Sequence, residues 1–222
     1  MKYTCILFDA DETLFDFNKL AGLKRLFHSY GVDFSKLDYE RYDLVNQQLW
    51  TQYQAHEIDA DTLQIERFNE WSARLQVPAM QLNNEFLDAM AEICQPLSGV
   101  RQLLNHLRGK VQLGIITNGF ARMQHKRIAH TGFEDYFDAL VISEEVGKAK
   151  PHPSIFEHTF SLLGNPPKQQ ILMVGDNIST DILGGINAGV DTCWLRHPNV
   201  ANNTDIKPTY TIENMLELIE IV

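Results

Sequence analysis

A chain of 222 residues with 44% hydrophobic content can bury a core, which excludes a mainly disordered protein. The formal net charge of -10 repels polyanions and argues against binding of extended nucleic acid. No apolar run approaches the roughly 18 residues of a membrane span, and the N-terminal run is too short for the apolar core of a signal peptide. We therefore expect a cytoplasmic protein that does not bind membranes.

The first apolar run, from Tyr3 to Phe8, breaks into two carboxylates, Asp9 and Asp11. An uninterrupted run of β-favouring residues predicts a strand that is buried on both faces of a parallel sheet. Asp9 then lies at the carboxyl end of the strand, which is the edge where open α/β sheets bind ligands. Because residues two apart on an extended chain point the same way, the two carboxylates are predicted to converge on one ligand.

Residues 17–96 carry helical patterns throughout. The spacing of apolar residues predicts four amphipathic helices in succession, which would form a small bundle. They span Asn18–Tyr30, Asp38–Glu57, a segment that begins near Asp61, and a segment that ends before Pro96. The second helix is predicted to bury Tyr42, Val45, Leu49 and Tyr53, and the third to bury Leu63, Phe68, Trp71 and Leu75.

Helices and strands alternate from Ser98 onward. The predicted strands are Val111–Ile116, Ala139–Ile142, Ile171–Val174, Thr192–Leu195 and Tyr210–Ile212, and the predicted helices include Ser98–Arg108, Ser154–Leu163 and Asn214–Val222. This alternation is typical of an α/β fold with a Rossmann-like parallel sheet and right-handed crossovers. We expect residues 1–16 and 97–222 to form the α/β core domain, and residues 17–96 to be an inserted helical domain.

Polar residues follow each of the four strongest predicted strands. They are Asp9 and Asp11, then Thr117 and Asn118, then Ser143, then Asp176. The carboxyl ends of parallel strands meet at one edge of a sheet, so we expect these groups and Lys150 to gather there. Carboxylates alone would repel a phosphate, but three of them can hold Mg²⁺, which prefers oxygen ligands and then neutralises phosphoryl oxygens.

Four motifs make the chain resemble the haloacid dehalogenase superfamily of phosphotransferases. In chain order they are Asp9-Ala10-Asp11-Glu12-Thr13, Ile115-Ile116-Thr117-Asn118-Gly119, Lys150 in Lys150-Pro151-His152-Pro153, and Gly175-Asp176-Asn177-Ile178-Ser179-Thr180-Asp181. The resemblance covers essentially the whole chain and implies a helical cap on an α/β core. Lys148 is an alternative to Lys150, which is favoured by its place before Pro151.

The resemblance also implies catalytic roles. Asp9 would be the nucleophile that forms an aspartyl-phosphate, and Asp11 would protonate the leaving oxygen and then activate water. The side chains of Asp9 and Asp176, with the backbone carbonyl of Asp11, would ligate Mg²⁺, for which Mn²⁺ or another divalent cation would substitute. Asp181 would orient the metal shell.

The second and third motifs would then bind the phosphoryl group. The resemblance assigns this role to Thr117, Asn118 and Lys150, with Thr117 and Lys150 also stabilising charge in the transition state.

The second carboxylate, Asp11, indicates an oxygen leaving group, because dehalogenases of this superfamily expel halide without a proton and lack it. Stretches such as Ile115–Phe120 and Val174–Trp194 look closest to bacterial pyrimidine 5'-nucleotidases. The implied reaction is hydrolysis of nucleoside monophosphates such as UMP, dUMP or dTMP, with the cap excluding water and selecting the leaving group.

Other functions remain open on the sequence. One is a phosphatase or mutase for phosphosugars or phosphoglycolate, and another is a non-catalytic sensor of phosphorylated ligands. A binder has no need of both a nucleophile and its acid, which argues against the sensor. In each case the partner is a small phosphomonoester, and we expect a monomer or a weak homo-oligomer.

Overall fold

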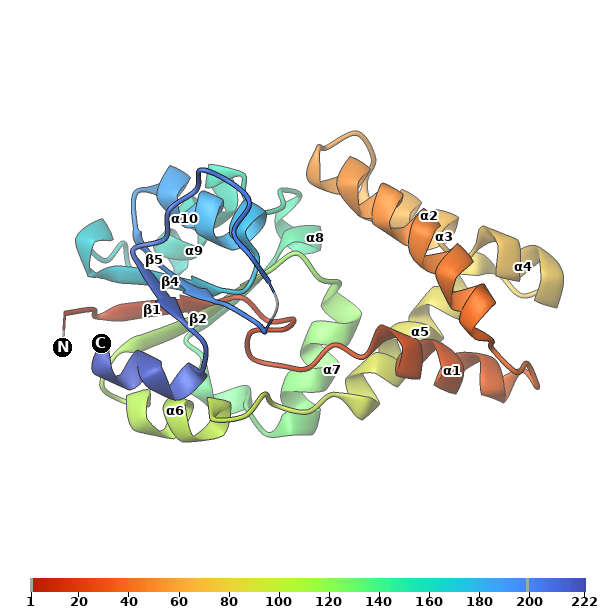
Figure 1. Cartoon of the computed structure of the whole chain (residues 1–222), viewed down its shortest axis with the longest axis horizontal. Coiled ribbons are helices and arrows are strands. Elements are labelled where there is room, and N and C mark those ends of the chain that lie inside the picture. The colour runs from red at the N-terminus through yellow and green to blue at the C-terminus, as the bar shows by residue number, and fades with distance from the viewer. Residues whose placement is uncertain (1, 199) are drawn as a thin grey trace. The chain divides into compact units, whose positions relative to one another are not determined.

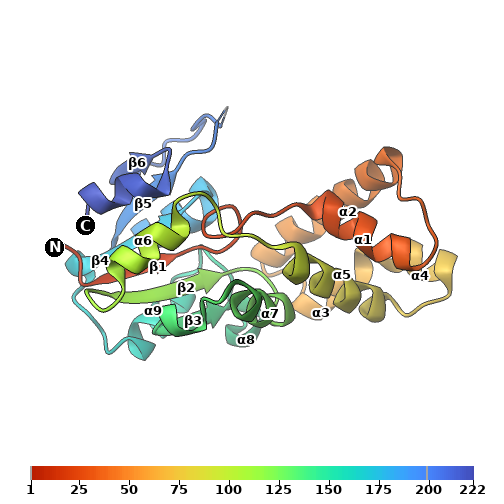
Figure 2. The same ribbon diagram turned by 90° about the horizontal axis from the view of Figure 1, so that it is seen from below.

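A computed structural model describes residues 2–198 and 200–222. Its central feature is a sheet of six strands, all parallel, in the order β3-β2-β1-β4-β5-β6 (Figures 1 and 2). The strands are β1 Cys5–Phe8, β2 Gln112–Thr117, β3 Ala139–Ile142, β4 Ile171–Gly175, β5 Asp191–Leu195 and β6 Tyr210–Ile212. The predicted α/β fold with a parallel sheet is confirmed.

The register of the sheet brings the motif-bearing strand ends together. Phe8 pairs with Ile115 of β2 on one side and with Val174 of β4 on the other. All four residues of β1 are buried, as a strand covered on both faces requires. Asp9 is therefore the first residue beyond the central strand, and its N–H still donates to the Val174 carbonyl at 2.9 Å.

Helices cover both faces of the sheet. Figure 1 shows α9 and α10 on one face and α6 on the other, where α6 packs against the closing helix η4. These elements and the shorter ones of the same unit are α6 Val100–Leu107, α8 Ser143–Val146, α9 Pro153–Leu162, α10 Leu183–Ala188, the 3₁₀ helices η1 Glu134–Tyr136, η2 Lys168–Gln170 and η4 Met215–Glu220, and the π-helix η3 Ile178–Ile182. The closing helix is thus a short 3₁₀ helix and begins one residue later than Asn214, whose side chain caps it.

The chain divides into two compact units. The α/β unit contains residues up to Asp16, Gln95–Gly119 and Thr131–Val222, and the helical unit contains Phe17–Cys94 and Phe120–His130. The helices of the second unit are α1 Lys19–Ser29, α2 Lys36–Gln54, α3 Ala60–Glu66, α4 Asn69–Leu75, α5 Ala79–Ile93 and α7 Ala121–Thr131, whose last residue is grouped with the α/β unit. The predicted boundaries at 16 and 97 assign Phe120–His130 to the α/β domain, whereas this segment is grouped with the helical unit. The boundaries remain a proposal.

Helix α7 is joined to α5 by charged side chains. Arg122 donates to both carboxylate oxygens of Asp88 at 2.7 Å, and Lys126 pairs with the same carboxylate at 2.6 Å. The two cations lower the pKa of Asp88, mainly through the Arg122 hydrogen bonds. The sequence analysis predicts no helix in this stretch.

The predicted third helix of the insertion is wrong, because the structure has two helices there. Helix α3 ends at Glu66 and α4 begins at Asn69, with Arg67 and Phe68 between them. Phe68 is fully buried, so the break does not disturb the apolar spacing that predicted one helix. The insertion therefore contains five helices, α1 to α5, rather than four.

The buried face of α2 also differs from the predicted one. Tyr42 and Tyr53 are buried as expected, but Val45 is 42% exposed and Asn46 is only 4% exposed. The spacing of apolar residues cannot predict that a polar residue such as Asn46 is buried.

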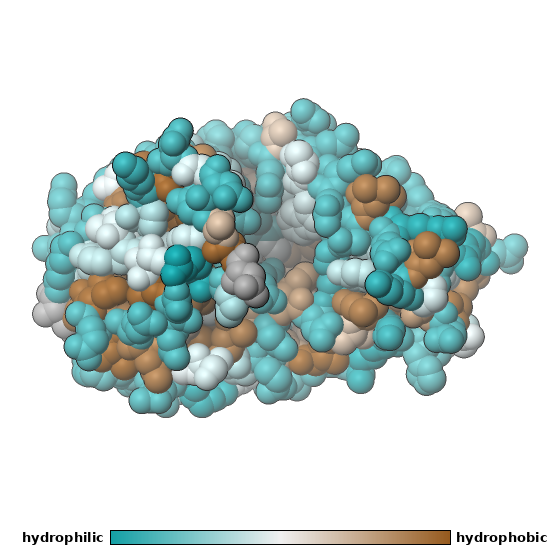
Figure 3. Space-filling view, in the orientation of Figure 1, coloured by the Kyte–Doolittle hydropathy of each residue, from teal (hydrophilic) through white to brown (hydrophobic). Residues whose placement is uncertain are grey.

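One face of the molecule is drawn in Figure 3 by residue hydropathy. On the face shown in Figure 3, hydrophilic residues predominate and hydrophobic ones are interspersed among them. Among the described residues, no helix has the length and apolar character needed to cross a membrane.

Candidate active site

The loop after β1 is held in a fixed turn. The carbonyl of Ala10 accepts hydrogen bonds from the N–H groups of Leu14 and Phe15, each at 3.0 Å. Glu12 has a φ of +57°, in the left-handed region that is unfavourable for most side chains. Its carbonyl accepts a 2.6 Å hydrogen bond from Nε2 of His197, in the segment after β5. His197 thus anchors the residue that follows Asp11.

Lys150 is the central cation of the site. Its side chain is 2% exposed, and its Nζ lies 2.5 Å from Oδ1 of Asp9, 2.8 Å from Oδ1 of Asp181 and 2.7 Å from the carbonyl of Ile116. An ammonium group has three protons, so these three acceptors account for all of them. Burial lowers the pKa of Lys150, but the two carboxylates outweigh burial and raise it above its usual range. Lys148, the alternative in the sequence, is exposed.

Asp181 reaches the site from the π-helix η3. Its Oδ2 accepts from the N–H of Asn177 at 3.0 Å, and its Oδ1 accepts from the hydroxyl of Thr180 at 3.2 Å. The carboxylate also lies against Gly175, where a Cβ would sit only 2.2 Å from Oδ2 of Asp181. The glycine of the Gly-Asp motif therefore leaves room for this buried acid.

Asp176 is held from two sides. The hydroxyl of Thr13 donates to Oδ1 of Asp176 at 3.2 Å, and the N–H of Asp176 is 3.1 Å from the same hydroxyl oxygen. The indole Nε1 of Trp194 donates to the Asp176 carbonyl at 2.8 Å. The first motif and β5 together fix the acid that follows β4.

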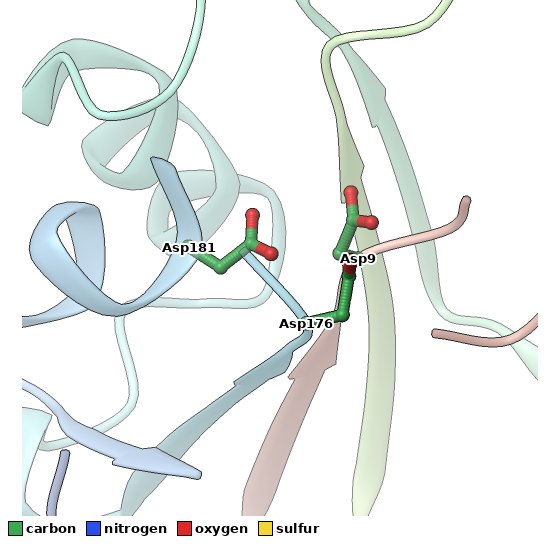
Figure 4. Close-up of side chains that lie close together, drawn as sticks. All are labelled: Asp9, Asp176 and Asp181. Carbon is green, nitrogen blue, oxygen red and sulfur yellow. The ribbon is translucent and has the colours of Figure 1, made fainter. Parts of the chain in front are cut away.

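The three carboxylates gather at the carboxyl edge of the sheet. Asp9, Asp176 and Asp181 each offer an oxygen, and these oxygens lie within 4.8 Å of one another (Figure 4). Burial, followed by repulsion from Asp9 and Asp181, raises the pKa of Asp176 to about 8. Burial also raises the pKa of Asp9 to about 7, although Lys150 opposes the shift.

This donor set fits a hard divalent cation. Oxygen ligands are those that Mg²⁺ and Ca²⁺ prefer, and carboxylates crowded enough to keep protons near neutral pH gain most from a cation that replaces those protons. Lys150 already compensates Asp9 and Asp181, so Asp176 is the acid that depends most on such a cation.

The two polar residues after β2 have different surroundings. The hydroxyl of Thr117, which is 1% exposed, accepts from the N–H of Gly119 at 3.0 Å. The Asn118 amide donates to the Lys150 carbonyl at 2.9 Å, and its oxygen accepts from the Lys150 N–H at 2.7 Å. The side chain of Asn118 therefore fixes the backbone of Lys150. Phosphate binding by Asn118 stays a prediction, and with this geometry it would use the backbone N–H.

The sequence predicts which strand ends meet but not the side chains that support them. Thr13 is predicted only as part of the first motif, and no pattern assigns a role to Trp194 or His197. Trp194 lies in a weakly predicted strand and His197 two residues after it, and both bond to backbone carbonyls, for which no side-chain pattern exists. Asp11 lies in the loop that His197 anchors, and it is partly exposed whereas Asp9 is buried.

Comparison with known proteins agrees with this geometry. The family model described as haloacid dehalogenase-like hydrolase matches residues 3–189, which includes every motif named above. The chain belongs to this family. It is accordingly a hydrolase with the fold that the strand order and the inserted helices display.

Relatives extend over the whole chain. Pyrimidine 5'-nucleotidase YjjG of Escherichia coli (strain K12) is 49% identical over 222 residues, covering 100% of this chain and 99% of its own. Pyrimidine 5'-nucleotidase PynA of Streptococcus pneumoniae (strain ATCC BAA-255 / R6) is 30% identical, covering 99% and 95%. Among solved structures, the magnesium-bound putative HAD-hydrolase YfnB of Bacillus subtilis has a TM-score of 0.86 at 28% identity, covering 100% of this chain and 99% of that chain.

Proposed function

We propose that this hydrolase is a Mg²⁺-dependent phosphatase that acts through an aspartyl-phosphate, with pyrimidine nucleoside monophosphates such as UMP, dUMP and dTMP as substrates. The observation that carries the proposal is the Asp9 carboxylate, placed at the end of the central strand beside Lys150 and within reach of Asp176 and Asp181. The full-length similarity to two proteins named pyrimidine 5'-nucleotidases supports the substrate class.

The proposed reaction uses the chain's own residues in two steps. Asp9 attacks phosphorus, and Asp11 gives its proton to the departing nucleoside oxygen, leaving a phosphoryl group bonded to Asp9. Asp11 then takes a proton from a water molecule, which attacks the same phosphorus and releases phosphate and free Asp9. Lys150 favours the ionised form of Asp9 that attacks in the first step, and Thr117 and Asn118 would bind the phosphoryl oxygens.

The proposed cation has a defined place in this scheme. The side chains of Asp9 and Asp176 and the carbonyl of Asp11 would hold it, while Asp181 keeps Lys150 and the segment after β4 in place. When bound, Mg²⁺ would supply positive charge to the phosphoryl oxygens. The magnesium-bound structure of YfnB supports this choice of metal for a protein of the same fold. A cytoplasmic location and a monomeric or weakly oligomeric state also remain part of the proposal.

A substrate panel tests the proposal. Phosphate release would be measured with UMP, dUMP, dTMP, ribose 5-phosphate and phosphoglycolate, with Mg²⁺ and with a chelator. We expect the pyrimidine nucleotides to have the highest kcat/KM and the chelator to abolish turnover. If ribose 5-phosphate or phosphoglycolate is hydrolysed more efficiently, the substrate assignment is wrong and the phosphosugar alternative takes its place.

The covalent step has its own test. Asp9→Asn should lower turnover by roughly a thousandfold or more, since loss of a nucleophile removes the reaction path itself. The variant should remain folded, because it loses a buried acid whose pKa is raised by burial. Asp135→Asn, at an exposed position, is the matched control. Undiminished phosphate release by Asp9→Asn would exclude the aspartyl-phosphate.

A further inference from the structure

Trp194 is the residue of β5 that lies beside the fourth motif. In the register of the sheet it pairs with Gly175, the last residue of β4, and Asp176 is the next residue along the chain. Trp194 is 3% exposed, and its indole Nε1 donates to the Asp176 carbonyl at 2.8 Å. A side chain of β5 therefore bonds to the backbone of the acid that depends most on a cation.

The place of the acceptor is what makes this hydrogen bond informative. A buried indole N–H needs an acceptor, and many carbonyl groups of a sheet could serve. The carbonyl that Trp194 contacts is not one of the paired groups, because the register of β4 and β5 ends at Gly175 and Trp194. The indole thus fixes a carbonyl that the parallel ladder no longer holds.

The backbone of Asp176 is anchored on both sides of its Cα. The hydroxyl of Thr13, which is fully buried, accepts from the Asp176 N–H at 3.1 Å, and Trp194 donates to the carbonyl. With both groups bonded, the backbone dihedral angles of Asp176 have little freedom. The direction in which the carboxylate leaves the chain is therefore set by Thr13 and Trp194 together.

The Asp176 carboxylate needs such anchors because its neighbours repel it. Oxygens of Asp9, Asp176 and Asp181 lie within 4.8 Å of one another (Figure 4). The ion pairs of Lys150 go to Asp9 and Asp181. Repulsion from these two acids contributes to the raised pKa of Asp176 and favours any backbone conformation that turns Asp176 away. A ligand that had to turn back would weaken the binding of a cation.

We propose that Trp194 is a positioning residue for the cation site. Its indole N–H holds the Asp176 backbone, so that the carboxylate faces Asp9 before the cation arrives and binding needs no rearrangement of this segment. Trp194 acts through Asp176 and touches neither the cation nor the substrate. This inference rests on the proposed Mg²⁺ site and adds a residue that sets the affinity of that site.

The test uses Trp194→Phe in the full-length protein, because phenylalanine keeps an aromatic ring in the core and has no N–H donor. The Kd for Mg²⁺ would be measured by isothermal titration calorimetry without substrate. We expect it to rise about tenfold, which is the lower end of the range for lost hydrogen-bond partners of metal ligands. At saturating Mg²⁺ the kcat and KM of the variant should return to within about twofold of the wild type.

Trp71→Phe is the matched control, since it makes the same substitution at a buried position of the helical unit. Trp71 is 4% exposed and its ring lies 4.2 Å from that of Phe27 and 5.5 Å from that of Phe34. The substitution should lower the Tm through lost packing and leave the Kd for Mg²⁺ unchanged. A lower Tm with an unchanged Kd is also what a purely structural role of Trp194 would give.

A second measurement leaves Trp194 in place. The chain has three tryptophans, Trp50, Trp71 and Trp194. Their indole N–H resonances in ¹⁵N-labelled protein can be assigned with Trp50→Phe and Trp71→Phe. Mg²⁺ should shift the Trp194 resonance in a saturable way, with a midpoint at the calorimetric Kd, because the acceptor of this N–H belongs to the proposed metal ligand.

The outcomes separate this inference from the proposed function. A wild-type protein that binds no Mg²⁺ in either measurement would refute the proposed metal site. A wild type that binds Mg²⁺ and a Trp194→Phe variant that binds it equally well would overturn only the positioning role of Trp194. So would a Trp194 resonance that stays in place while calorimetry shows that Mg²⁺ is bound.

Discussion

The ammonium of Lys150 lies 2.8 Å from the Asp181 carboxylate, and both side chains are almost completely buried. Asp181 therefore balances a cation that also contacts Asp9. Because one cation serves both carboxylates, removal of Lys150 leaves Asp9 and Asp181 in an apolar environment without their shared partner.

Lys150→Met should accordingly destabilise the protein by about 3–5 kcal/mol, since Asp9 and Asp181 would lose their shared cation. The free energy of unfolding from urea titrations checks this value. Lys148→Met is the control, because Lys148 is exposed, and it should leave stability within about 0.5 kcal/mol of the wild type. Similar destabilisation by both substitutions would contradict the assignment of the buried cation to Lys150.

Asp11→Asn should affect substrates according to their leaving group. Loss of a general acid–base costs roughly 10²–10⁴ in rate for a nucleoside leaving group, which must be protonated. The loss should be smaller with p-nitrophenyl phosphate in the first step, because p-nitrophenolate leaves without a proton. We expect a burst of p-nitrophenolate and a phosphoryl group retained on the protein, detectable by mass spectrometry. Equal losses on UMP and p-nitrophenyl phosphate without a burst would argue against the acid–base role.

The stability of the metal-free protein should fall as the pH rises from about 4, the pKa of a free aspartate, to about 8, the pKa of Asp176 in the folded protein. Its pKa of about 8 means that the native state keeps a proton that the unfolded state releases above about pH 4. Between these values the native state binds more protons, so unfolding becomes easier with increasing pH. Asp176→Asn cannot ionise and should lose this dependence.

The measurement is the difference in Tm between Asp176→Asn and wild type without metal, which should grow from about pH 5 to about pH 8. Mg²⁺ should raise the Tm of the wild type more than that of the variant, because it stabilises the ionised acid. Asp205→Asn, at an exposed site, should show a constant difference. A constant difference for Asp176→Asn as well would mean that Asp176 is not the titrating group.

His197→Ala should lower kcat roughly five- to tenfold with little change in KM, because the Glu12 carbonyl loses one hydrogen bond and the loop that carries Asp11 loses its anchor. His197→Gln offers an N–H donor again and should recover part of the rate, which a purely steric role would not allow. His158→Ala, on the exposed side of α9, should have no effect. Wild-type rates for His197→Ala would remove His197 from the supports of the loop.

The parallel sheet explains why so much of the site was predictable. Once Tyr3–Phe8, Val111–Ile116 and Ile171–Val174 are recognised as buried strands, their polar ends must meet at one edge. No contact needs to be known in advance. The choice of Lys150 over Lys148 followed from Pro151, and the structure places Lys150 against Asp9.

Prediction failed where polar residues are buried or where a helix ends without a breaker. In α7, Gln124 and Arg127 are buried beside Met123 and Ile128, so the sequence lacks an apolar face. The break between α3 and α4 contains neither glycine nor proline. Tertiary packing determines both features.

The grouping of α7 with the inserted helices determines which segments must be exchanged together in a chimaeric protein. A chimaera that takes residues 17–94 from a relative would keep α7 of this chain. The residues in contact at Asp88 and Arg122, and at Trp50 and Phe120, would then come from two different proteins. The inserted residues 17–94 therefore do not form a compact unit without residues 120–130. A chimaera of two family members should stay folded only when the donor segment and its matching residues at 120–130 are moved together.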